Sequence, residues 1–588
     1  MLTQQNIKIE AVCDPIVDVK LEEYKINDIT YVNVQIDAKE FIHFPKVDLI
    51  WHYPIIDIQS YWHPGSGRSK SFGVDWDGGF SSKGTVSAPV GCFYSQDGKN
   101  RLSVAYSKAM ETVAFNLGVH EENGTIKCHI TLFTEQTKKM KQYHATIRID
   151  TRDIPYYEAI EEISKWYETI ENNKPSIVPE ESKLPMYCTW YSFHQNVTDH
   201  AIEEQSRHAK QFGCEAVIVD DGWQTEDNQR GYAYCGDWEV AASKIPNMKE
   251  HVEKVHAMGM KYLLWYSVPF VGKHAKVWDQ FRNKILYFQE SLQAGVLDPR
   301  YPEVREYLIS VYETALKEWN IDGFKFDFID NFDVRRANEK ALEPDENRDF
   351  ESVQEAVDRL LTDVMERLRV IKPSIMIEFR QRYIGPHMRK YGNIFRVMDC
   401  PNDAITNRVG VIDLRLFSGS TAVHSDPIMW NKKDTVESAA LQLINVLFGV
   451  PQFSMRFENL SHSHLEMAKY WLGFWKEHRD VLLNGKLKAE APELLYPIVS
   501  AENDVTKIIA VYGDVVVKSG KSSVSNLIIV NGTLKEELVL DLEEDIMDHT
   551  LEIYDCCGHL VKKQFLSLHA GLNRLHVQKS GILMIKKG

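Results

Sequence analysis

The stretch EVREYLISVYETALKEWNIDGFKFDFI (303–329) joins two patterns that together decide the fold class. Its first part, 303–319, repeats apolar residues at the spacing of an amphipathic helix. Its last part, 323–329, is a short apolar run rich in phenylalanine. Runs of this kind are typical of strands that are buried on both faces, as in parallel sheets. The stretch therefore predicts a helix that leads back into a parallel strand.

Similar units surround this one. Seven further apolar runs are PMYCTWYSF (185–193), EAVIVDD (215–221), KYLLWY (261–266), IMIEF (375–379), IFRVMD (394–399), STAVHSD (420–426) and GVPQFSM (449–455). Amphipathic stretches lie between them at 198–212, 247–258, 350–370 and 434–447. Eight strands mostly separated by helices predict a closed (β/α)₈ TIM barrel. The run at 394 follows its predecessor too closely for a full helix, so one crossover is predicted to be irregular.

An open, doubly wound sheet is the alternative to the barrel. No G-x-G-x-x-G motif follows the first strand, which disfavours the nucleotide-binding version of that fold.

The chain before the barrel alternates apolar and polar residues, as in TYVNVQIDA, and the chain after it contains short strand-like runs such as SNLIIVNG. This pattern predicts a multidomain chain of α/β and all-β parts. We expect an N-terminal β-sandwich domain with a linker helix (1–175), a catalytic barrel (176–485) and a C-terminal antiparallel β-sandwich (486–588).

The composition excludes several classes of protein. The 588 residues carry 68 Lys and Arg against 84 Asp and Glu, a net charge of −16, so a basic face for nucleic acid is not expected. No apolar run of about 18 residues predicts a transmembrane helix, and no membrane partner is expected. The N-terminus lacks the pattern of a signal peptide. Nine cysteines, an odd number without a CxxC pair, favour a reducing, cytoplasmic setting.

Polar and aromatic residues gather where the predicted strands end, which is where barrel enzymes place their active sites. The residues at these ends are Trp190, Tyr191, Asp220, Asp221, Trp265, Lys325, Asp327, Asp330, Glu378, Arg380, Arg396, Asp399, His424 and Asp426. A single aspartate here is readily explained as a helix cap. The whole set is not, because burying unpaired carboxylates costs several kcal/mol.

Carboxylates together with aromatic rings indicate a carbohydrate ligand, and two carboxylates that flank a glycosidic bond are what its hydrolysis requires. The alternative use of such a rim is binding of a divalent metal. Paired histidines are missing, and Lys325 and Arg396 would compete with a cation. We therefore expect no metal and no other cofactor.

Three segments resemble a known family. VDDGW (219–223), FKFDF (324–328) and FRVMDCPND (395–403) are similar to motifs of the retaining α-galactosidases of glycoside hydrolase family 36, whose clan includes families 27 and 31. The resemblance implies an N-terminal β-supersandwich, a (β/α)₈ barrel and a C-terminal β-domain. It also implies an exo-acting enzyme that removes terminal α-galactosyl residues from oligosaccharides, and self-association into a homo-oligomer.

The resemblance also implies roles for individual residues. Asp327 would be the nucleophile and Asp399 the acid/base, with Asp403 as a rival proton donor. The substrate-binding set would be Asp220 and Asp221 for the C4 and C6 hydroxyls, Trp190 and Trp265 as aromatic walls, and Lys325, Glu378, Arg380 and Arg396.

One departure from the family pattern leaves the sugar open. Many members carry a cysteine and a Gly-rich loop after the fifth strand, which read the C2 substituent, whereas this chain has Arg380 in IEFRQRYIGP (377–386). The alternatives are an α-N-acetylgalactosaminidase, an α-glucosidase-like relative, a transglycosylase, or a non-catalytic carbohydrate-binding protein. Linkage preference and oligomeric state also stay open.

Two more residues near the predicted site are interpreted as structural. Asp413 is expected to pair with Arg408 or Arg415, and His424 is expected to be a satisfied buried histidine.

Overall fold

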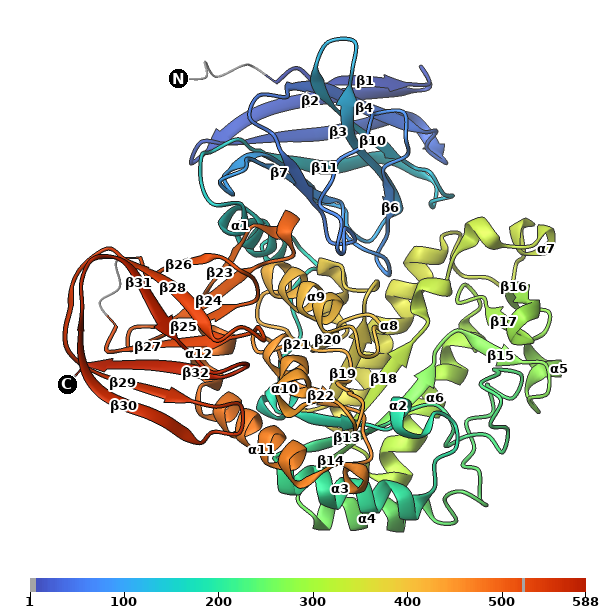
Figure 1. Ribbon diagram of the computed structural model, residues 1–588. Coiled ribbons are helices and arrows are strands. Elements are labelled where there is room, and N and C mark those ends of the chain that lie inside the picture. The colour runs from blue at the N-terminus through green and yellow to red at the C-terminus, as the bar shows by residue number, and fades with distance from the viewer. Residues whose placement is uncertain (1–6, 521–523, 588) are drawn as a thin grey trace.

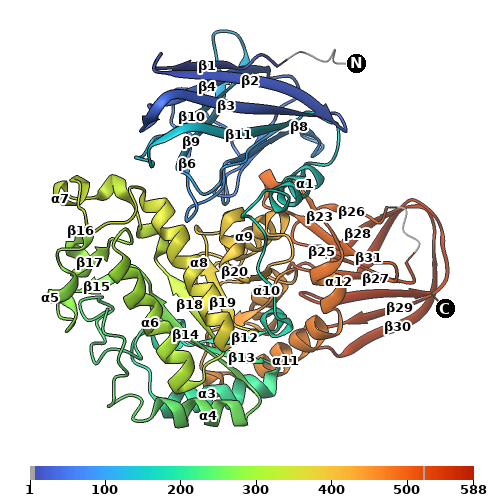
Figure 2. The ribbon, with the colours of Figure 1, turned by 180° about the vertical axis from the view of Figure 1, so that it is seen from behind.

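The computed structural model describes residues 7–520 and 524–587, and its elements form three groups along the chain (Figure 1). Two β-sheets come first, a ring of parallel strands with its helices follows, and two more sheets complete the chain. Seen from behind, helix α1 (Tyr156–Glu168) lies where the three groups meet (Figure 2). The predicted fold class is confirmed. The domain boundaries after residues 175 and 485 stay a prediction.

The central barrel has eight parallel strands, which match the eight apolar runs. They are β12 (Met186–Cys188), β13 (Ala216–Val219), β14 (Lys261–Ser267), β18 (Gly323–Asp327), β19 (Met376–Arg380), β20 (Ile394–Arg396), β21 (Ala422–His424) and β22 (Gln452–Phe453). Strand β22 pairs with β12. The amide of Val450 donates to the carbonyl of Val423 at 2.8 Å, and this bond closes the ring between β21 and β22.

Alternation along the strands explains why the barrel carries a polar site. Met186, Ala216, Leu263, Met376 and Ile394 point to one face and form an apolar cluster. The residues between them pack against the surrounding helices in the large core. Side chains two residues further on share the inner face, because successive side chains alternate across a strand. The charged residues of the predicted site therefore stand directly above an apolar floor.

Helices surround the barrel. The long ones are α3 (Asp199–Phe212), α4 (Met248–Ala257), α6 (Pro302–Trp319), α8 (Val353–Ile371), α9 (Ala404–Phe417) and α10 (Val436–Ile444), followed by α11 (His462–Glu477) and α12 (Arg479–Asn484). Short helical pieces are α2 (Trp190–Phe193), α5 (Trp278–Phe281), α7 (Glu339–Leu342), η1 (Glu180–Lys183), η2 (Glu290–Leu292), η3 (Ile329–Asn331), η4 (Val334–Arg336), η5 (Pro386–Lys390), η6 (Phe457–Asn459) and η7 (Pro492–Leu494). Only η5 separates β19 from β20, so the predicted irregular crossover is confirmed.

Two features of the barrel region were not predicted. A three-stranded sheet of β15 (Phe270–Gly272), β16 (Ile285–Gln289) and β17 (Ala294–Leu297) lies in the crossover between β14 and β18. Helix α9 is buried along most of its length. Its pattern therefore lacks the polar stripe that marks an amphipathic helix in a sequence.

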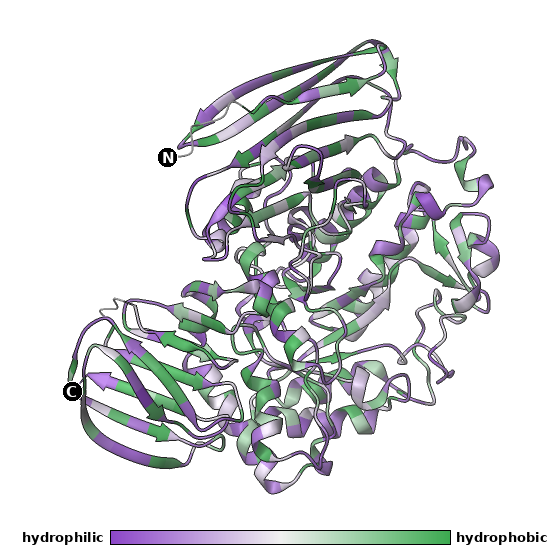
Figure 3. Cartoon of the chain, turned by 45° about the horizontal axis from the view of Figure 1, so that its top comes forward, coloured by the Kyte–Doolittle hydropathy of each residue, from purple (hydrophilic) through white to green (hydrophobic). Residues whose placement is uncertain are grey.

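The N-terminal sheets have five and six strands. The first contains β1 (Glu10–Cys13), β4 (Val47–Pro54), β10 (Thr125–Leu132), β9 (Val113–His120) and β6 (Phe80–Ser82). The second contains β2 (Val17–Ile26), β3 (Ile29–Ile42), β11 (Met140–Asp150), β8 (Asn100–Tyr106), β7 (Val90–Tyr94) and β5 (Ser60–Trp62). Apolar and polar residues alternate along these strands (Figure 3), which places one face of each sheet in a shared core.

The C-terminal sheets have seven and three strands. The larger contains β23 (Lys486–Glu490), β24 (Ile498–Glu502), β25 (Thr506–Val511), β27 (Asn526–Asn531), β32 (Ile582–Lys587), β29 (Ile546–Tyr554) and β30 (Leu560–Leu568). The smaller contains β26 (Val516–Lys518), β28 (Glu537–Leu542) and β31 (Gly571–His576). Pairing is antiparallel except between β25 and β27 and between β26 and β28, a detail that differs from a fully antiparallel sandwich.

Within the described part of the chain, every helix is too short or too polar to span a bilayer.

Asp413 of α9 connects the three groups of elements. Its carboxylate accepts from Trp62 Nε1 of β5 at 2.8 Å and pairs with Lys70 Nζ, in the loop after β5, at 2.9 Å. It also accepts from the Tyr496 hydroxyl at 2.5 Å, which comes from the C-terminal part. The predicted pairing with Arg408 or Arg415 is wrong. Those two guanidiniums instead donate to Asn445 and to backbone carbonyls.

We expect Asp413→Asn to lower the free energy of unfolding by about 3–5 kcal/mol, because it leaves the buried ammonium of Lys70 without its counter-charge. Urea unfolding followed by circular dichroism measures this. The matched control is Glu537→Gln in the exposed pair Glu537–Arg574, which should leave the midpoint nearly unchanged. Equal midpoints for the two variants would contradict the assignment.

Candidate active site

Asp327 ends β18 and receives four hydrogen bonds. Oδ1 accepts from Arg380 Nε at 2.8 Å, from the amide of Phe328 at 2.8 Å and from the Tyr383 hydroxyl. Oδ2 accepts from Trp265 Nε1 at 3.1 Å. The side chain is 8% exposed. One oxygen is thus saturated with donors, and the other keeps a free lone pair.

The charges around Asp327 keep it ionised. Burial raises the pKa of a carboxyl group, but Arg380 and Lys325 lower the pKa of Asp327 by more, with help from Tyr383 and Trp265. The net result is a pKa well below the usual value. A carboxylate that stays ionised in a buried place, with one oxygen available, is suited to nucleophilic attack.

Lys325 and Asp220 form a buried ion pair at the bottom of the site, directly above the apolar floor. Lys325 Nζ lies 2.5 Å from Asp220 Oδ2. The Cys188 thiol lies 3.4 Å from the same oxygen, and Oδ1 accepts from the amide of Asp221. Burial lowers the pKa of Lys325, but Asp220 more than offsets this and raises it above the usual value. Lys325 therefore stays charged beside the Asp327 carboxylate.

Asp221 faces different partners. Its oxygens accept from Gln195 Nε2 at 2.8 Å and from Gln224 Nε2 at 2.6 Å. Burial raises the pKa of Asp221 to about 7, against the opposing effect of the two amides. The two adjacent aspartates thus meet separate sets of neighbours, as expected for successive residues at the end of a strand.

The two predicted aromatic walls differ from expectation. Trp190 was placed on the first strand, but it begins the short helix α2, because β12 ends two residues earlier. It is half-buried, with the guanidinium of Arg230 over its ring at 6.0 Å. Trp265 is 1% exposed, and the ring of Tyr232 stacks on it at 6.2 Å. Trp265 therefore presents its N–H edge to Asp327 rather than an open face.

Arg396 joins three carboxylates. Nη1 donates to Asp426 Oδ1, and Nη2 donates to Asp399 Oδ1 at 2.9 Å. Nε lies 3.5 Å from Glu378 Oε1. Glu378 is fully buried, and burial raises its pKa despite the cations nearby. Its other oxygen accepts from Gln452 Nε2 at 2.5 Å. Glu378 is therefore placed to hold Arg396 in position.

Asp399 is the open carboxylate of this group. Its side chain is 47% exposed, whereas Arg396 and Asp426 are buried. Burial tends to raise the pKa of Asp399, but Arg396, Lys325 and Arg380 together lower it. An exposed carboxyl at the rim, next to the cations that surround Asp327, has the access to solvent and substrate that a proton donor needs.

Asp403, the rival proton donor, caps a helix. Its Oδ1 accepts from the amide of Thr406 at 3.0 Å, and its Oδ2 accepts from the Thr406 hydroxyl at 2.6 Å. Arg68 lies 3.5 Å away. These contacts are those of an N-cap residue at the start of α9. Between the two candidates, Asp399 has the geometry of an acid/base.

His424 is a structural histidine, as interpreted. Its Nε2 lies 2.6 Å from the carbonyl of Ser182, and its Nδ1 accepts from Gln452 at 3.0 Å. Burial lowers the pKa of His424 to about 4, so the ring is neutral.

Sequence reasoning missed Tyr383 and left Asp426 outside the predicted set. Tyr383 lies in the loop after β19, three residues beyond Arg380, and nothing in the sequence indicates that this loop turns back to Asp327. Asp426 was recognised at a strand end. Its contact with Arg396 depends on the pairing of β20 with β21, which the predicted strand order implies.

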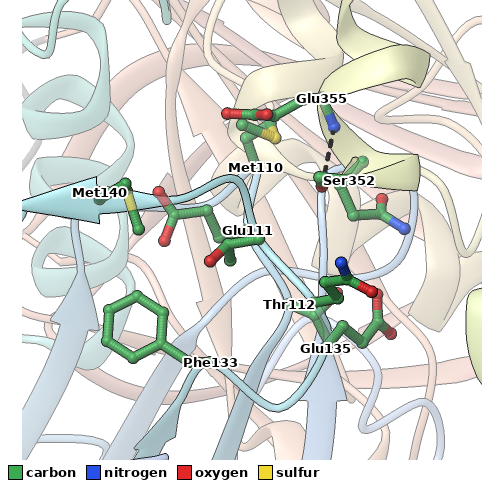
Figure 4. Close-up of a pocket in the computed structure, with 11 residues that line it drawn as sticks. Met110, Glu111, Thr112, Phe133, Glu135, Met140, Ser352 and Glu355 are labelled. Carbon is green, nitrogen blue, oxygen red and sulfur yellow. Dashed lines mark hydrogen bonds between the residues drawn. The ribbon is translucent and has the colours of Figure 1, made fainter. Parts of the chain in front are cut away.

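A separate cavity lies between the N-terminal sheets and the start of α8 (Figure 4). Glu111, Glu135 and Glu355 line it, and none of the predicted site residues does. Its volume of about 30 Å³ is far below the several hundred Å³ typical of ligand sites.

The melibiase family model matches residues 158–384, which include Lys325, Asp327 and Arg380. A crystal structure of a variant of α-galactosidase AgaA from Geobacillus stearothermophilus, of glycoside hydrolase family 36, superposes with a TM-score of 0.63 at 14% identity. That superposition covers 97% of this chain and 81% of the other. The chain is similar to the family 36 α-galactosidases.

Curated α-galactosidases match over shorter stretches. Alpha-galactosidase 2 of Pediococcus pentosaceus is 24% identical over 158 residues, which cover 26% of this chain and 22% of the relative. Alpha-galactosidase AgaA of Geobacillus stearothermophilus is 26% identical over 168 residues, which cover 27% of this chain and 22% of the relative. The matched part thus spans less than a quarter of each of these two relatives. At 14% identity, the structural likeness establishes the shared fold.

Proposed function

We propose that the protein is a retaining, exo-acting α-galactosidase that hydrolyses terminal α-D-galactosyl residues of oligosaccharides. One observation carries the proposal. A buried, ionised Asp327 and an exposed Asp399 lie at one barrel rim, and three cations, Lys325, Arg380 and Arg396, lie near Asp399. The likeness to family 36 α-galactosidases supports it. One of those neighbours is described in complex with raffinose.

The proposed mechanism is a double displacement. Asp327 attacks the anomeric carbon through Oδ2, because Oδ1 is occupied by three donors. Asp399 gives its proton to the leaving oxygen, and a covalent glycosyl-enzyme forms. Asp399 then takes a proton from water, which attacks the anomeric carbon and releases the sugar with its configuration retained.

Substrate binding falls to the other residues of the rim. Lys325, Asp220 and Asp221 supply donors and acceptors for sugar hydroxyls, and Trp190 is the more accessible of the two predicted tryptophans. Arg380 and Trp265 hold Asp327 in place, and Arg396 with Glu378 holds Asp399. Neither a metal nor another cofactor takes part in this proposal.

A second candidate is a related α-glycosidase or transglycosylase with a different sugar. The observation that favours it is Arg380, whose guanidinium contacts Asp327 and lies 5.4 Å from the rings of Phe328 and Tyr383. A guanidinium beside the nucleophile restricts the space next to the anomeric carbon. Arg380 therefore limits which substituent the sugar can carry at C2, the ring carbon next to the anomeric carbon.

Turnover of a panel of 4-nitrophenyl glycosides tests the proposal. We expect the α-galactoside to be hydrolysed with kcat/KM at least tenfold above the α-glucoside and the α-N-acetylgalactosaminide, since polar contacts to one hydroxyl discriminate strongly. ¹H NMR of the first product should show the α-anomer. Preference for another glycoside would favour the second candidate, and a β-anomer would contradict retention.

We also keep a cytoplasmic location and a homo-oligomer as part of the proposal. All nine cysteines are free thiols, which suits a reducing compartment.

A further inference from the structure

Two carboxylates share one guanidinium at the rim of the barrel. Arg396 Nη2 donates to Asp399, and Nη1 of the same side chain donates to Asp426. Asp426 follows β21 and is fully buried, whereas Asp399 is open to solvent. A substrate can therefore reach one of the two and not the other.

Asp426 is also tied to the backbone next to Asp399. Its Oδ2 accepts from the amide of Cys400 at 2.8 Å, and Cys400 directly follows Asp399. The same oxygen accepts from the Tyr191 hydroxyl at 2.9 Å. The amide of Asp426 is fixed in turn by Asn407 Oδ1 at 2.9 Å. Asp426 is thus connected to Asp399 in two ways: through the guanidinium of Arg396, and through the backbone amide of the residue that follows Asp399.

The proposed reaction makes a demand that Asp399 alone does not meet. Its first step needs a proton on Asp399, but a guanidinium in contact with a carboxylate favours the ionised form. Without a competing negative charge, Arg396 would keep Asp399 deprotonated and unable to protonate the leaving group.

We propose that Asp426 is a positioning residue that controls how firmly Asp399 holds its proton, through the guanidinium that both carboxylates share. When Asp426 is ionised, it neutralises Arg396, and Asp399 keeps its proton more readily. In the glycosylation step that proton moves to the leaving oxygen as the bond from that oxygen to the anomeric carbon breaks, and Asp426 neither gains nor loses one. The inference rests on the proposed glycosidase function.

The two carboxylates have different charged and titratable neighbours. Asp426 is faced by Arg396, Asp399, Tyr191 and Cys400. Asp399 is faced by Arg396, Lys325, Arg380, Asp327 and Tyr191. Burial raises the pKa of Asp426 to about 7, with Arg396 acting against it. The cations lower the pKa of Asp399, so Asp399 is the more acidic of the two carboxylates, and loss of the proton from Asp426 near neutral pH is the step that would raise the pKa of Asp399.

The decisive variant is Asp426→Asn, which keeps the shape and removes the charge. Of its three carboxylates, Arg396 would then keep Asp399 and the buried Glu378, and it would lower the pKa of Asp399 further. The basic limb of the kcat/KM profile, which reports the acid in the free enzyme, should move down by about one to two pH units. The loss at neutral pH should be at least tenfold for a poor leaving group. It should be small for a 2,4-dinitrophenyl glycoside, whose departure needs no protonation.

Two further variants separate control of protonation from a structural role. Tyr191→Phe removes one donor from Asp426, favours its neutral form, and should shift the limb in the same direction by less. It also provides the test if Asp426→Asn does not fold. Asp413→Asn removes a buried carboxylate of α9 that does not contact Arg396, so it should lower stability and leave the limb in place.

The outcomes are distinct. A basic limb that stays in place in active Asp426→Asn, with a uniform loss at every pH and for every leaving group, would overturn this inference alone. A wild-type protein that is inert on all glycosides would overturn the proposed function and this inference together.

Discussion

Replacing Asp327 with alanine should lower kcat/KM for an aryl α-galactoside by a factor on the order of 10⁴ or more, because the nucleophile of the covalent step is lost. The floor of the site should survive, since Lys325 keeps its pair with Asp220. Arg380 and Tyr383 lose their common acceptor, so some loss of stability is expected as well. Stopped assays at high enzyme concentration measure the residual rate.

Azide distinguishes a nucleophile from a structural carboxylate. In Asp327→Ala, azide can occupy the vacated space and attack the α-galactoside directly, which gives the β-galactosyl azide. Product NMR and mass spectrometry identify this compound. If the variant keeps more than a tenth of the wild-type rate, or if its main effect is a lower melting temperature, Asp327 is not the nucleophile.

Replacing Asp399 with alanine should give a loss that depends on the leaving group. For a poor leaving group such as a second sugar we expect about 10²–10⁴-fold in kcat/KM, the usual contribution of general acid catalysis. For a dinitrophenyl leaving group the first step should be nearly unaffected. Azide should then attack the accumulated glycosyl-enzyme and give the α-galactosyl azide, opposite in configuration to the product of Asp327→Ala.

Asp403→Asn is the matched control for Asp399→Ala. It changes the rival carboxyl four residues away, whose contacts are those of a helix cap. We expect a loss of at most about 1–2 kcal/mol in stability and rates within a few-fold of wild type. The reverse result, with a leaving-group-dependent loss in Asp403→Asn and none in Asp399→Ala, would exchange the roles of the two residues.

The barrel could be predicted because its strands are buried on both faces. Runs such as 216–219 and 262–266 are continuous and apolar, and the helices between them carry an apolar stripe, so each leaves a distinct pattern. The candidate carboxylates followed from the same reasoning, because strand ends converge at one rim. Lys325, Asp327, Arg396 and Asp399 lie together there, as expected.

The partners of these residues could not be predicted to the same degree. Tyr383 reaches Asp327 through the path of a loop, and loop paths leave no periodic pattern in the sequence. The prediction that Asp413 pairs with Arg408 or Arg415 was wrong because it considered only residues nearby in the sequence. The true partners, Lys70 and Tyr496, are 343 and 83 residues away from Asp413 along the chain. Trp190 was misplaced because β12 ends after three residues, although the apolar run continues.

The contacts of Asp413 have a consequence for the modularity of this architecture. Trp62, Lys70 and Tyr496 come from the two flanking parts, and they satisfy one carboxylate on a helix of the barrel. A barrel made without the flanking parts would lose all three partners of this carboxylate, and the face of α9 that they cover would be exposed. We therefore expect the barrel to depend on the flanking sheets, so that gene fusion or recombination would have to transfer the three parts together.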